Sequence, residues 1–298
     1  MNEGEMIVKI LITGSKGQLG LEVAKQLRGN KETDLLLTDI DELDITKVDL
    51  LMPFMRAQKP DVVINCAAYT AVDDCETHED LAFKINAIGP RNLAIASQDI
   101  GAKMVHISTD YVFNGEGILD NEGIIRPYNE FDHPDPKTVY GKTKYESEVF
   151  VRNINARSYT IRTAWLYGEG NNFVRTMLKL SQERDLVKVV NDQHGSPTST
   201  RELARLITHL IDTDNYGLFH GTCEGNCTWY EFTKEIYRLM EVKTEIIPVT
   251  TEEYPRPARR PKFSVLDNYM LRMTSDFAFR HWKEEIADYL QQHKEASL

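Results

Sequence analysis

The sequence predicts an α/β protein built on a doubly wound parallel sheet, with a smaller lobe toward the C-terminus. Strand-like and helix-like segments alternate through the first two-thirds of the 298 residues, which is typical of parallel sheets covered by helices. A glycine-rich turn directly follows the first apolar segment, and the alternation breaks down late in the chain. We therefore expect residues 6–190 to form mainly the sheet domain and residues 191–298 mainly the smaller lobe, with some chain crossing back to the sheet.

Each strand is predicted from a short apolar run, the pattern of strands buried on both faces, and the first of these runs is rich in β-branched residues. These runs are 7–13, 35–38, 62–66, 103–108, 159–162 and 187–190. Helices are predicted where apolar residues recur at helical spacing. They cover 18–28, 47–58, 81–100, 140–153, 173–183, 201–212, 229–240 and 282–292, and Thr228 is the expected N-cap of the helix that follows it. The ligand is expected in a cleft between the lobes, outside the carboxyl ends of the strands.

The turn after the first strand carries three glycines in the spacing G-x-x-G-x-x-G. Between a strand and a helix, such a turn lets backbone N–H groups and a helix N-terminus meet a pyrophosphate. A plain flexible turn is the alternative, but the context favours a dinucleotide-binding loop of a Rossmann-type domain. Its residues are Gly14, Lys16, Gly17, Gln18, Leu19 and Gly20.

The second strand ends in Asp39, about 20 residues beyond the glycines, where such folds place the carboxylate that binds a ribose hydroxyl. Asp44 and Ile45 follow and are expected to border the adenine. An acid at Asp39 favours NADH because it repels a 2′-phosphate, whereas Lys16 in the loop offsets that charge. A solvated strand end is the alternative for Asp39, and the sequence leaves the choice between NADPH and NADH open.

Tyr140 and Lys144 lie four residues apart, so on a helix they share one face. A phenol has an ordinary pKa of about 10 and is a poor acid–base group at neutral pH. A nearby ammonium favours the phenolate and lowers that pKa, which suits the pair to exchange a proton with a carbonyl or alcohol oxygen. The alternative is two residues that share an exposed helix face by chance.

Two other strand ends carry candidate residues. Ala67 and Ala68 follow the third strand, and their small side chains let a cofactor sugar approach the backbone, unless they only form a tight turn. Thr109 and Asp110 follow the next strand. A threonine there can bind a substrate carbonyl and fix its position, or it can simply cap the strand.

Composition excludes several classes of function. The formal net charge is −11, so the chain lacks the basic footprint of nucleic-acid-binding proteins. No apolar run approaches the ~20 residues that span a bilayer, and the polar first five residues carry no signal-peptide pattern, so we expect a cytoplasmic protein without membrane partners. Four cysteines form no secreted-type disulfide framework. Cys223, Cys227 and His220 lack the spacing and the fourth ligand of common zinc sites.

Taken together, these segments resemble the extended short-chain dehydrogenase/reductase superfamily, and within it the dTDP-4-dehydrorhamnose reductases. The superfamily resemblance rests on the glycine loop and on residues 65–69, 108–113 and 140–144. The narrower one rests on residues 71–73, 162–165, 192–198 and 260–261. One departure is Ala164, where that family commonly has a serine, and its methyl group removes one polar contact.

The resemblance implies roles for the candidate residues. Tyr140 would donate the proton, and Lys144 would bind the nicotinamide ribose and lower the tyrosine pKa. Thr109 would orient the sugar carbonyl. Other implied cofactor contacts are Ala67, Ala68 and Tyr69, and other implied substrate contacts are Val72, Asp110, Trp165, Arg259 and Arg260. A core tryptophan is the alternative for Trp165, and a solvated basic loop is the alternative for the arginines, whose forked guanidinium groups suit a diphosphate.

The implied activity is reduction of the 4-keto group of dTDP-4-dehydro-L-rhamnose to dTDP-L-rhamnose, with NADPH as cofactor and NADH as the alternative. A homodimer and a Mg²⁺ ion held by glutamates belong to the same resemblance; Glu22 falls at one ligand position, but the sequence identifies no others. Two rival functions use the same fold. One is a nucleotide-sugar epimerase or dehydratase with tightly bound NAD. The other is a non-catalytic regulatory subunit, against which the presence of Tyr140, Lys144 and Thr109 argues.

Overall fold

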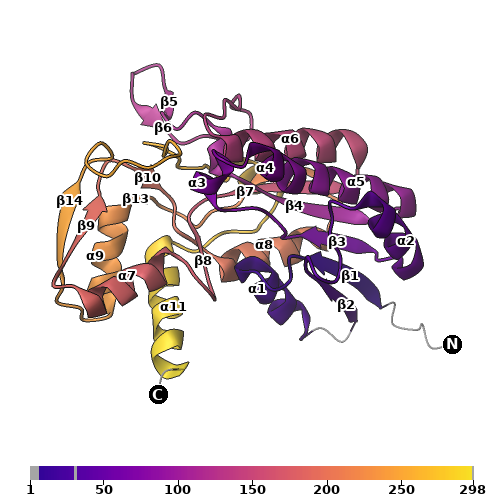
Figure 1. The fold of residues 1–298 in the computed structure, drawn as a ribbon, viewed down its shortest axis with the longest axis horizontal. Helices are drawn as coiled ribbons and strands as arrows, with labels where there is room; N and C mark the ends of the chain where they lie inside the picture. Colours follow the sequence, from indigo (N-terminus) through magenta and orange to yellow (C-terminus); the bar gives the residue numbers. More distant parts are fainter. Residues whose placement is uncertain (1–6, 30–31, 297–298) are drawn as a thin grey trace.

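The computed structural model describes residues 7–29 and 32–296 (Figure 1). The polar first five residues and the outer limits of the two predicted domains, residues 6 and 298, lie outside the described residues. A central sheet of six parallel strands has the order β12-β7-β4-β3-β1-β2. Its strands are β1 (Val8–Thr13), β2 (Thr33–Thr38), β3 (Val62–Asn65), β4 (Lys103–Thr109), β7 (Ser158–Thr163) and β12 (Gly217–His220). The predicted α/β fold is confirmed.

Helices cover both faces of this sheet. The α-helices of the described residues, those of the smaller lobe included, are α1 (Gln18–Leu27), α2 (Val48–Gln58), α3 (Val72–Cys75), α4 (Glu79–Phe83), α5 (Gly89–Ile100), α6 (Val139–Ile154), α7 (Phe173–Glu183), α8 (Thr200–Ile211), α9 (Trp229–Leu239), α10 (Tyr269–Thr274) and α11 (Trp282–Ala296). Helices α1 and α8 pack together on one face, and α2, α5 and α6 pack side by side on the other (Figure 1). None of the described helices combines the length and apolar character needed to cross a membrane.

The predicted single helix over 81–100 is instead three pieces. Helix α4 passes into a π-helical turn at Lys84–Ile88, and α5 follows. Pro90 has no amide hydrogen to donate to the carbonyl of Asn86, so a regular α-helical ladder cannot run through this point. The fully buried Asn86 side chain bonds instead to both the amide N–H and the carbonyl of Tyr69, which ties the turn to the loop after β3.

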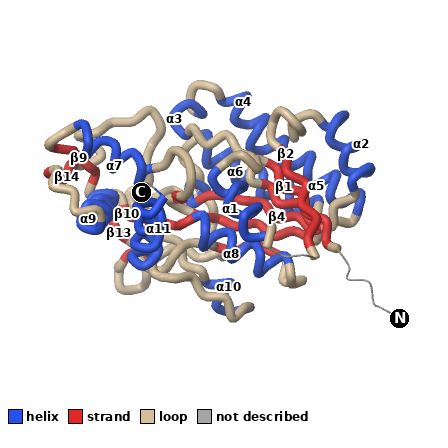
Figure 2. Tube along the Cα trace, turned by 90° about the horizontal axis from the view of Figure 1, so that it is seen from below, coloured by secondary structure: helices blue, strands red, loops and turns tan. Residues whose placement is uncertain are grey.

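The smaller lobe lies at one end of the sheet (Figures 1 and 2). It contains the parallel pair β9 (Leu186–Val190) and β14 (Glu245–Val249). Further two-residue strands are β5 (Ile118–Leu119), β6 (Ile125–Arg126), β8 (Leu166–Tyr167), β10 (His194–Gly195), β11 (Thr198–Ser199) and β13 (Cys227–Thr228). The predicted strand at 187–190 therefore forms outside the central sheet, and β12, which the sequence analysis missed, supplies the edge strand.

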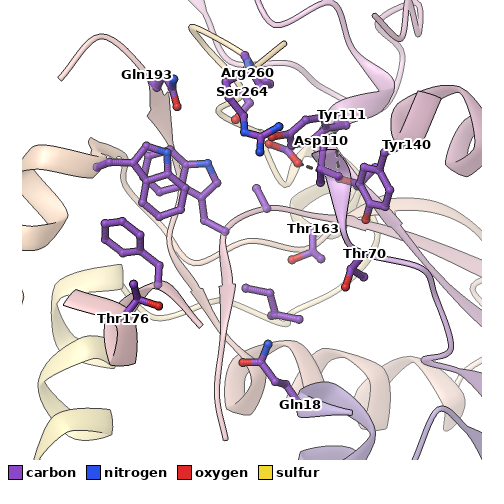
Figure 3. Close-up of a pocket in the computed structure, with 18 of the residues that line it drawn as sticks. Gln18, Thr70, Asp110, Tyr111, Tyr140, Thr163, Thr176, Gln193, Arg260 and Ser264 are labelled. Atoms are coloured by element: carbon purple, nitrogen blue, oxygen red, sulfur yellow. Dashed lines mark hydrogen bonds between the residues drawn. The ribbon is translucent and has the colours of Figure 1, made fainter. Parts of the chain in front are cut away.

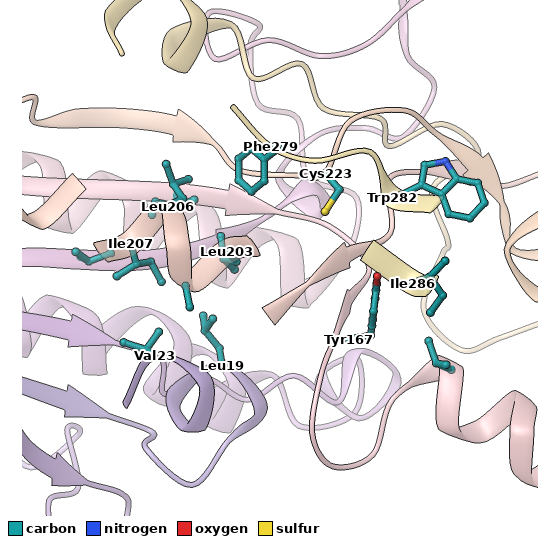
Figure 4. Close-up of a cluster of buried hydrophobic side chains, with 14 of the residues drawn as sticks. Leu19, Val23, Tyr167, Leu203, Leu206, Ile207, Cys223, Phe279, Trp282 and Ile286 are labelled. Carbon is teal, nitrogen blue, oxygen red and sulfur yellow. The ribbon is translucent and has the colours of Figure 1, made fainter. Parts of the chain in front are cut away.

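The two largest clusters of the apolar core lie on opposite faces of the sheet, and two small clusters lie around Phe113 and Cys75. Leu11, Leu51 and Val151 belong to the part under α2, α5 and α6. The other part begins at α1 and α8 and continues without a break to Trp282 and Ile286 of α11 (Figure 4). Because sheet and lobe share this second part, the lobe is held rigidly against the strand ends. The division at residue 190 remains a prediction.

Candidate active site

A cavity of ≈ 920 Å³ lies at the carboxyl ends of β1, β3, β4 and β7 and extends along α7 and β9. Its position fits the rule for doubly wound sheets, since the strand order reverses between β1 and β3. Figure 3 shows Asp110, Tyr111 and Tyr140 on one side of the cavity and Thr176 and Gln193 on the other. The predicted site residues that line it are Gly17, Gln18, Leu19, Ala67, Ala68, Val72, Thr109, Asp110, Tyr140, Lys144, Trp165 and Arg260.

The glycine loop packs tightly against the end of β3. Gly14 has a φ of +65°, and a Cβ atom there would lie 2.6 Å from the Ala67 nitrogen. Gly20 faces the backbone of Gly14 at similarly close range, so a side chain fits at neither position. The loop therefore lies at the β1–β3 junction with its Gly17–Leu19 segment open to the cavity. Gly14 and Gly20 serve close packing and are not themselves part of the cavity wall.

Five other predicted cofactor residues also lie outside the cavity wall, namely Tyr69 and the four residues near the end of β2 and the glycine loop. Asp39 at the end of β2 accepts a hydrogen bond from the Lys16 amide N–H at 3.0 Å. The Lys16 ammonium pairs with Glu42 at 2.7 Å and lies 3.7 Å from Asp41. The Asp44 carboxylate caps its own turn through Thr46, and Ile45 is buried in the core. Asp39 and Lys16 thus flank the glycine loop, as a ribose-binding pair would, and the adenine contacts of Asp44 and Ile45 stay a prediction.

Tyr140 and Lys144 lie one turn apart on α6 and both line the cavity. Lys144 is 2% exposed, and its ammonium donates a hydrogen bond to the Ile107 carbonyl at 2.6 Å. Burial lowers the pKa of Lys144 to about 8. Burial, and secondly the Asp110 carboxylate, raise the pKa of the Tyr140 phenol above its ordinary value. The net change in the Tyr140 pKa is thus upward, which favours the protonated phenol of a proton donor. The predicted lowering of this pKa by Lys144 stays a prediction.

Thr109 and Asp110 form a hydrogen-bonded pair next to Tyr140. The Thr109 hydroxyl donates to the Asp110 carboxylate at 2.9 Å and accepts a hydrogen bond from the Tyr111 amide N–H at 3.3 Å. Asp110 is 3% exposed, and its burial raises the carboxyl pKa to about 6. Tyr111 also lines the cavity, and its ring meets the Tyr140 ring edge-on at 5.6 Å between centroids. The sequence analysis missed Tyr111, although it follows the predicted pair directly.

Trp165 is enclosed on both faces. Its indole stacks on Trp229 with ring centroids 3.4 Å apart and an interplanar angle of 5°. On the opposite side, a Cβ at Gly195 would lie 2.5 Å from the Trp165 Nε1. Phe173 packs against Trp229 and extends this aromatic group along the cavity. Trp165 therefore reaches the cavity with its edge, and a sugar that packs on its face must first separate it from Trp229.

The arginines of the 250–261 segment are paired with carboxylates. Arg260 donates to Asp73 at 2.8 Å, and Arg256 lies 3.8 Å from the same carboxylate. Arg259 pairs with Glu116 outside the cavity wall, whereas Arg256 and Arg260 line the cavity. Asp73 on α3 therefore fastens this segment over the cleft. The predicted phosphate contact fits Arg260 and Arg256 better than Arg259.

The structure offers no support for a metal site. Within residues 7–29 and 32–296, no group of three or more His, Cys, Asp or Glu side chains could hold a metal ion. Glu22 accepts a hydrogen bond from Gln26 at 3.0 Å and lies 3.6 Å from the Lys25 ammonium. Cys223 and Cys227 are buried thiols whose pKa values burial raises. Within the part of the chain that the structure describes, neither Glu22 nor the Cys223–Cys227 pair belongs to a set of side chains that could hold Mg²⁺ or zinc.

Several cavity residues were missed because their neighbours in space are distant in the chain. Trp229 and Phe173 come from separate helices of the lobe, and Tyr254 comes from the loop after β14. Each resembles an ordinary amphipathic or loop residue in sequence, so only the fold assigns it to the cleft. Thr70 could have been found from the sequence, because it follows the predicted Tyr69 directly. Tyr69 lies behind the cavity wall in the hydrophobic cluster around Cys75, and Thr70 lines the cavity.

Comparison with known proteins agrees with this geometry. The family described as RmlD substrate binding domain matches residues 8–295. A dTDP-4-dehydrorhamnose reductase of Clostridium acetobutylicum, known as a crystal structure, is 53% identical with a TM-score of 0.92 over 96% of this chain and 100% of that chain. A dTDP-4-dehydrorhamnose reductase of Bacillus anthracis, solved in complex with NADP, is 41% identical with the same TM-score and coverage. The spore coat polysaccharide biosynthesis protein SpsK of Bacillus subtilis is 42% identical over 291 residues, 97% of this chain and 99% of that protein. The resemblance seen in the sequence is thus confirmed, and the chain belongs to the RmlD substrate binding domain family within the extended short-chain dehydrogenase/reductases.

Proposed function

We propose that the chain reduces the 4-keto group of dTDP-4-dehydro-L-rhamnose to the alcohol of dTDP-L-rhamnose, with NADPH as the preferred cofactor and NADH as the alternative. The observation that carries the proposal is the meeting of Tyr140, Lys144 and Thr109 with the Gly17–Leu19 loop segment in one cavity. A cavity of ≈ 920 Å³ is large enough to hold reactive parts of both a dinucleotide and a sugar nucleotide.

In this mechanism the protein supplies orientation and one proton. A bound reduced nicotinamide supplies the hydride. The Tyr140 phenol, whose pKa burial raises, gives its proton to the developing alkoxide at C4. Lys144 holds the nicotinamide ribose and stabilises the phenolate that Tyr140 leaves behind. Thr109 positions the carbonyl, and Arg256 and Arg260 meet the diphosphate from the loop above the cleft.

A direct assay tests this proposal. The purified protein is mixed with NADPH and dTDP-4-dehydro-L-rhamnose, and the absorbance of the reduced nicotinamide is followed while the sugar product is identified. We expect one NADP⁺ released for each sugar reduced. An epimerase or dehydratase would recycle its bound cofactor without net consumption, and a regulatory subunit would bind the dinucleotide and oxidise none.

Lys16 is expected to determine how well NADPH is used. Its ammonium is exposed beside Asp39, and exposed ion pairs such as Lys16–Glu42 contribute little, so it is free to turn to a 2′-phosphate. Lys16→Ala should lower kcat/KM with NADPH by about tenfold and leave NADH nearly unchanged. The matched control is Lys25→Ala, which removes another exposed, paired lysine on α1. Equal losses with both cofactors would contradict this role.

A further inference from the structure

A third charged residue continues the face of α6 that carries Tyr140 and Lys144. Glu148 lies one further turn along the helix, so the three side chains follow each other at intervals of four residues. Glu148 is 5% exposed and is not part of the cavity wall. Its carboxylate therefore lies behind the cavity, on the protein side of Lys144.

The Glu148 carboxylate is held by two strands. Arg162 on β7 donates two hydrogen bonds to this carboxylate, one from Nε at 2.9 Å and one from Nη2 at 2.6 Å. The Ser108 hydroxyl on β4 donates to the same carboxylate at 2.5 Å. Arg162 is itself only 2% exposed, and its guanidinium lies over the Phe113 ring at 5.0 Å. The bidentate contact with Arg162 and the hydrogen bond from Ser108 together fix the orientation of the Glu148 carboxylate.

These contacts set the register of α6 on β4. Lys144 binds the carbonyl of Ile107, and Glu148 binds the side chain of Ser108, the next residue of the strand. Thr109, the residue after Ser108, faces the cavity beside Tyr140. Two consecutive turns of the helix are thus fastened to two consecutive residues of the strand, immediately before the strand reaches the candidate catalytic group.

The negative charge of Glu148 also acts on the Lys144 ammonium and raises its pKa. Burial lowers the pKa of Lys144, and the Glu148 charge opposes that change. Burial favours the neutral form of three other titratable groups around Lys144. It raises the pKa of the Cys66 thiol on the β3 side to about 12, raises the pKa of the Tyr140 phenol on α6, and lowers the pKa of His106 on β4 well below its usual value. Arg162 on β7 also carries a charge in this region, and its guanidinium is paired with the Glu148 carboxylate. The Glu148 carboxylate is therefore the group that favours the charged amine.

We propose that Glu148 is a positioning residue of the site: clamped by Arg162 and Ser108, it fixes α6 on β4 and keeps the Lys144 amine protonated where the cofactor ribose binds. This inference rests on the proposed function for the identity of the cofactor. It assigns to the buried Glu148–Arg162 pair a part in the reaction that a purely structural ion pair would not have.

The test compares Glu148→Gln with Glu148→Asp in the whole protein. NADPH affinity is measured by nicotinamide fluorescence from about pH 6 to 10, where Lys144 loses its proton. We expect wild-type affinity to fall above about pH 8, and the Glu148→Gln curve to fall one to two pH units, roughly, below that. Glu148→Asp keeps the charge and should restore most of the wild-type curve. Glu146→Gln, an exposed change on the same helix, should leave the curve unchanged.

The Glu148→Gln variant leaves Arg162 buried without its partner and so risks unfolding. If it does not fold, the double variant Glu148→Gln/Arg162→Met removes the uncompensated charge and is measured in its place. The same downward shift is expected, because Glu148, and not Arg162, is among the charges that act on the pKa of Lys144. A lowered melting temperature with an unshifted pH curve would overturn the proposal. A shifted curve in a protein that reduces no keto-sugar would instead retain it and reject the proposed reaction.

Discussion

Replacing Tyr140 by phenylalanine should lower kcat/KM for keto-sugar reduction by about 10²- to 10⁴-fold, the usual contribution of a positioned general acid. The change removes one hydroxyl and keeps the ring, which packs edge-on against Tyr111. NADPH affinity and melting temperature should therefore stay near the wild-type values. Initial rates with saturating cofactor, together with a fluorescence titration of NADPH, measure the two effects separately.

The matched control for this experiment is Tyr111→Phe, which removes a phenol hydroxyl from the same cavity. Its ring contacts Tyr140, but no step of the proposed reaction uses its proton. We expect this variant to keep most of its turnover. If Tyr111→Phe loses as much activity as Tyr140→Phe, or if Tyr140→Phe stays near the wild-type rate, Tyr140 is not the acid.

Lys144→Met should act in opposite directions on activity and on stability. Turnover and NADPH affinity should both fall by about 10²-fold or more, because the ribose loses its ammonium partner and the phenolate loses its stabilising charge. Stability near neutral pH should rise, because burial lowers the pKa of Lys144 from 10.5 to about 8 and a buried charge of this kind destabilises the folded state. The shift corresponds to a gain on the order of 3 kcal/mol in the free energy of unfolding.

The pH dependence of that gain is fixed in sign. Between about pH 8 and 10.5 the unfolded chain binds a proton at Lys144 that the folded protein lacks, so the wild type becomes more stable as pH rises. The advantage of Lys144→Met should therefore shrink with increasing pH, which urea unfolding at about pH 7 and pH 9.5 would measure. The exposed Lys142→Met is the control and should change neither quantity. A destabilised Lys144→Met protein at pH 7 would contradict the pKa assignment.

Local patterns were sufficient to predict most of the fold. Short apolar runs predicted five strands of the central sheet to within a few residues, and the Gly14–Gly20 loop lies at the β1–β3 junction. The edge strand β12 was missed because four residues, Gly217–His220, carry too little pattern. The π-helical turn was missed because it depends on a contact between distant parts of the chain, the hydrogen bonds of the Asn86 side chain to the backbone of Tyr69.

The candidate site was predicted where its residues are consecutive or four apart, and not where they meet only through folding. Tyr140 and Lys144 follow from helical spacing alone. The Trp165–Trp229 stack and the Asp73–Arg260 pair join residues far apart in the chain, which no local period indicates. The direction of the Tyr140 pKa change could not be predicted from the sequence either. It depends on burial and on the Asp110 carboxylate, and the spacing of a Tyr and a Lys indicates neither.

The hydrogen bond from Thr109 to Asp110 has a consequence for which form of the sugar the resting protein favours. A hydroxyl has a single hydrogen, and here Asp110 receives it. A ketone oxygen only accepts hydrogen bonds, so an arriving substrate must compete with an aspartate for that one hydrogen. An alcohol brings a hydrogen of its own and can donate to the free lone pair of Thr109. If Thr109 meets the reacting oxygen as proposed, its hydroxyl favours the alcohol over the ketone by about 1 kcal/mol, the usual worth of one hydrogen bond, until Asp110 takes up a proton.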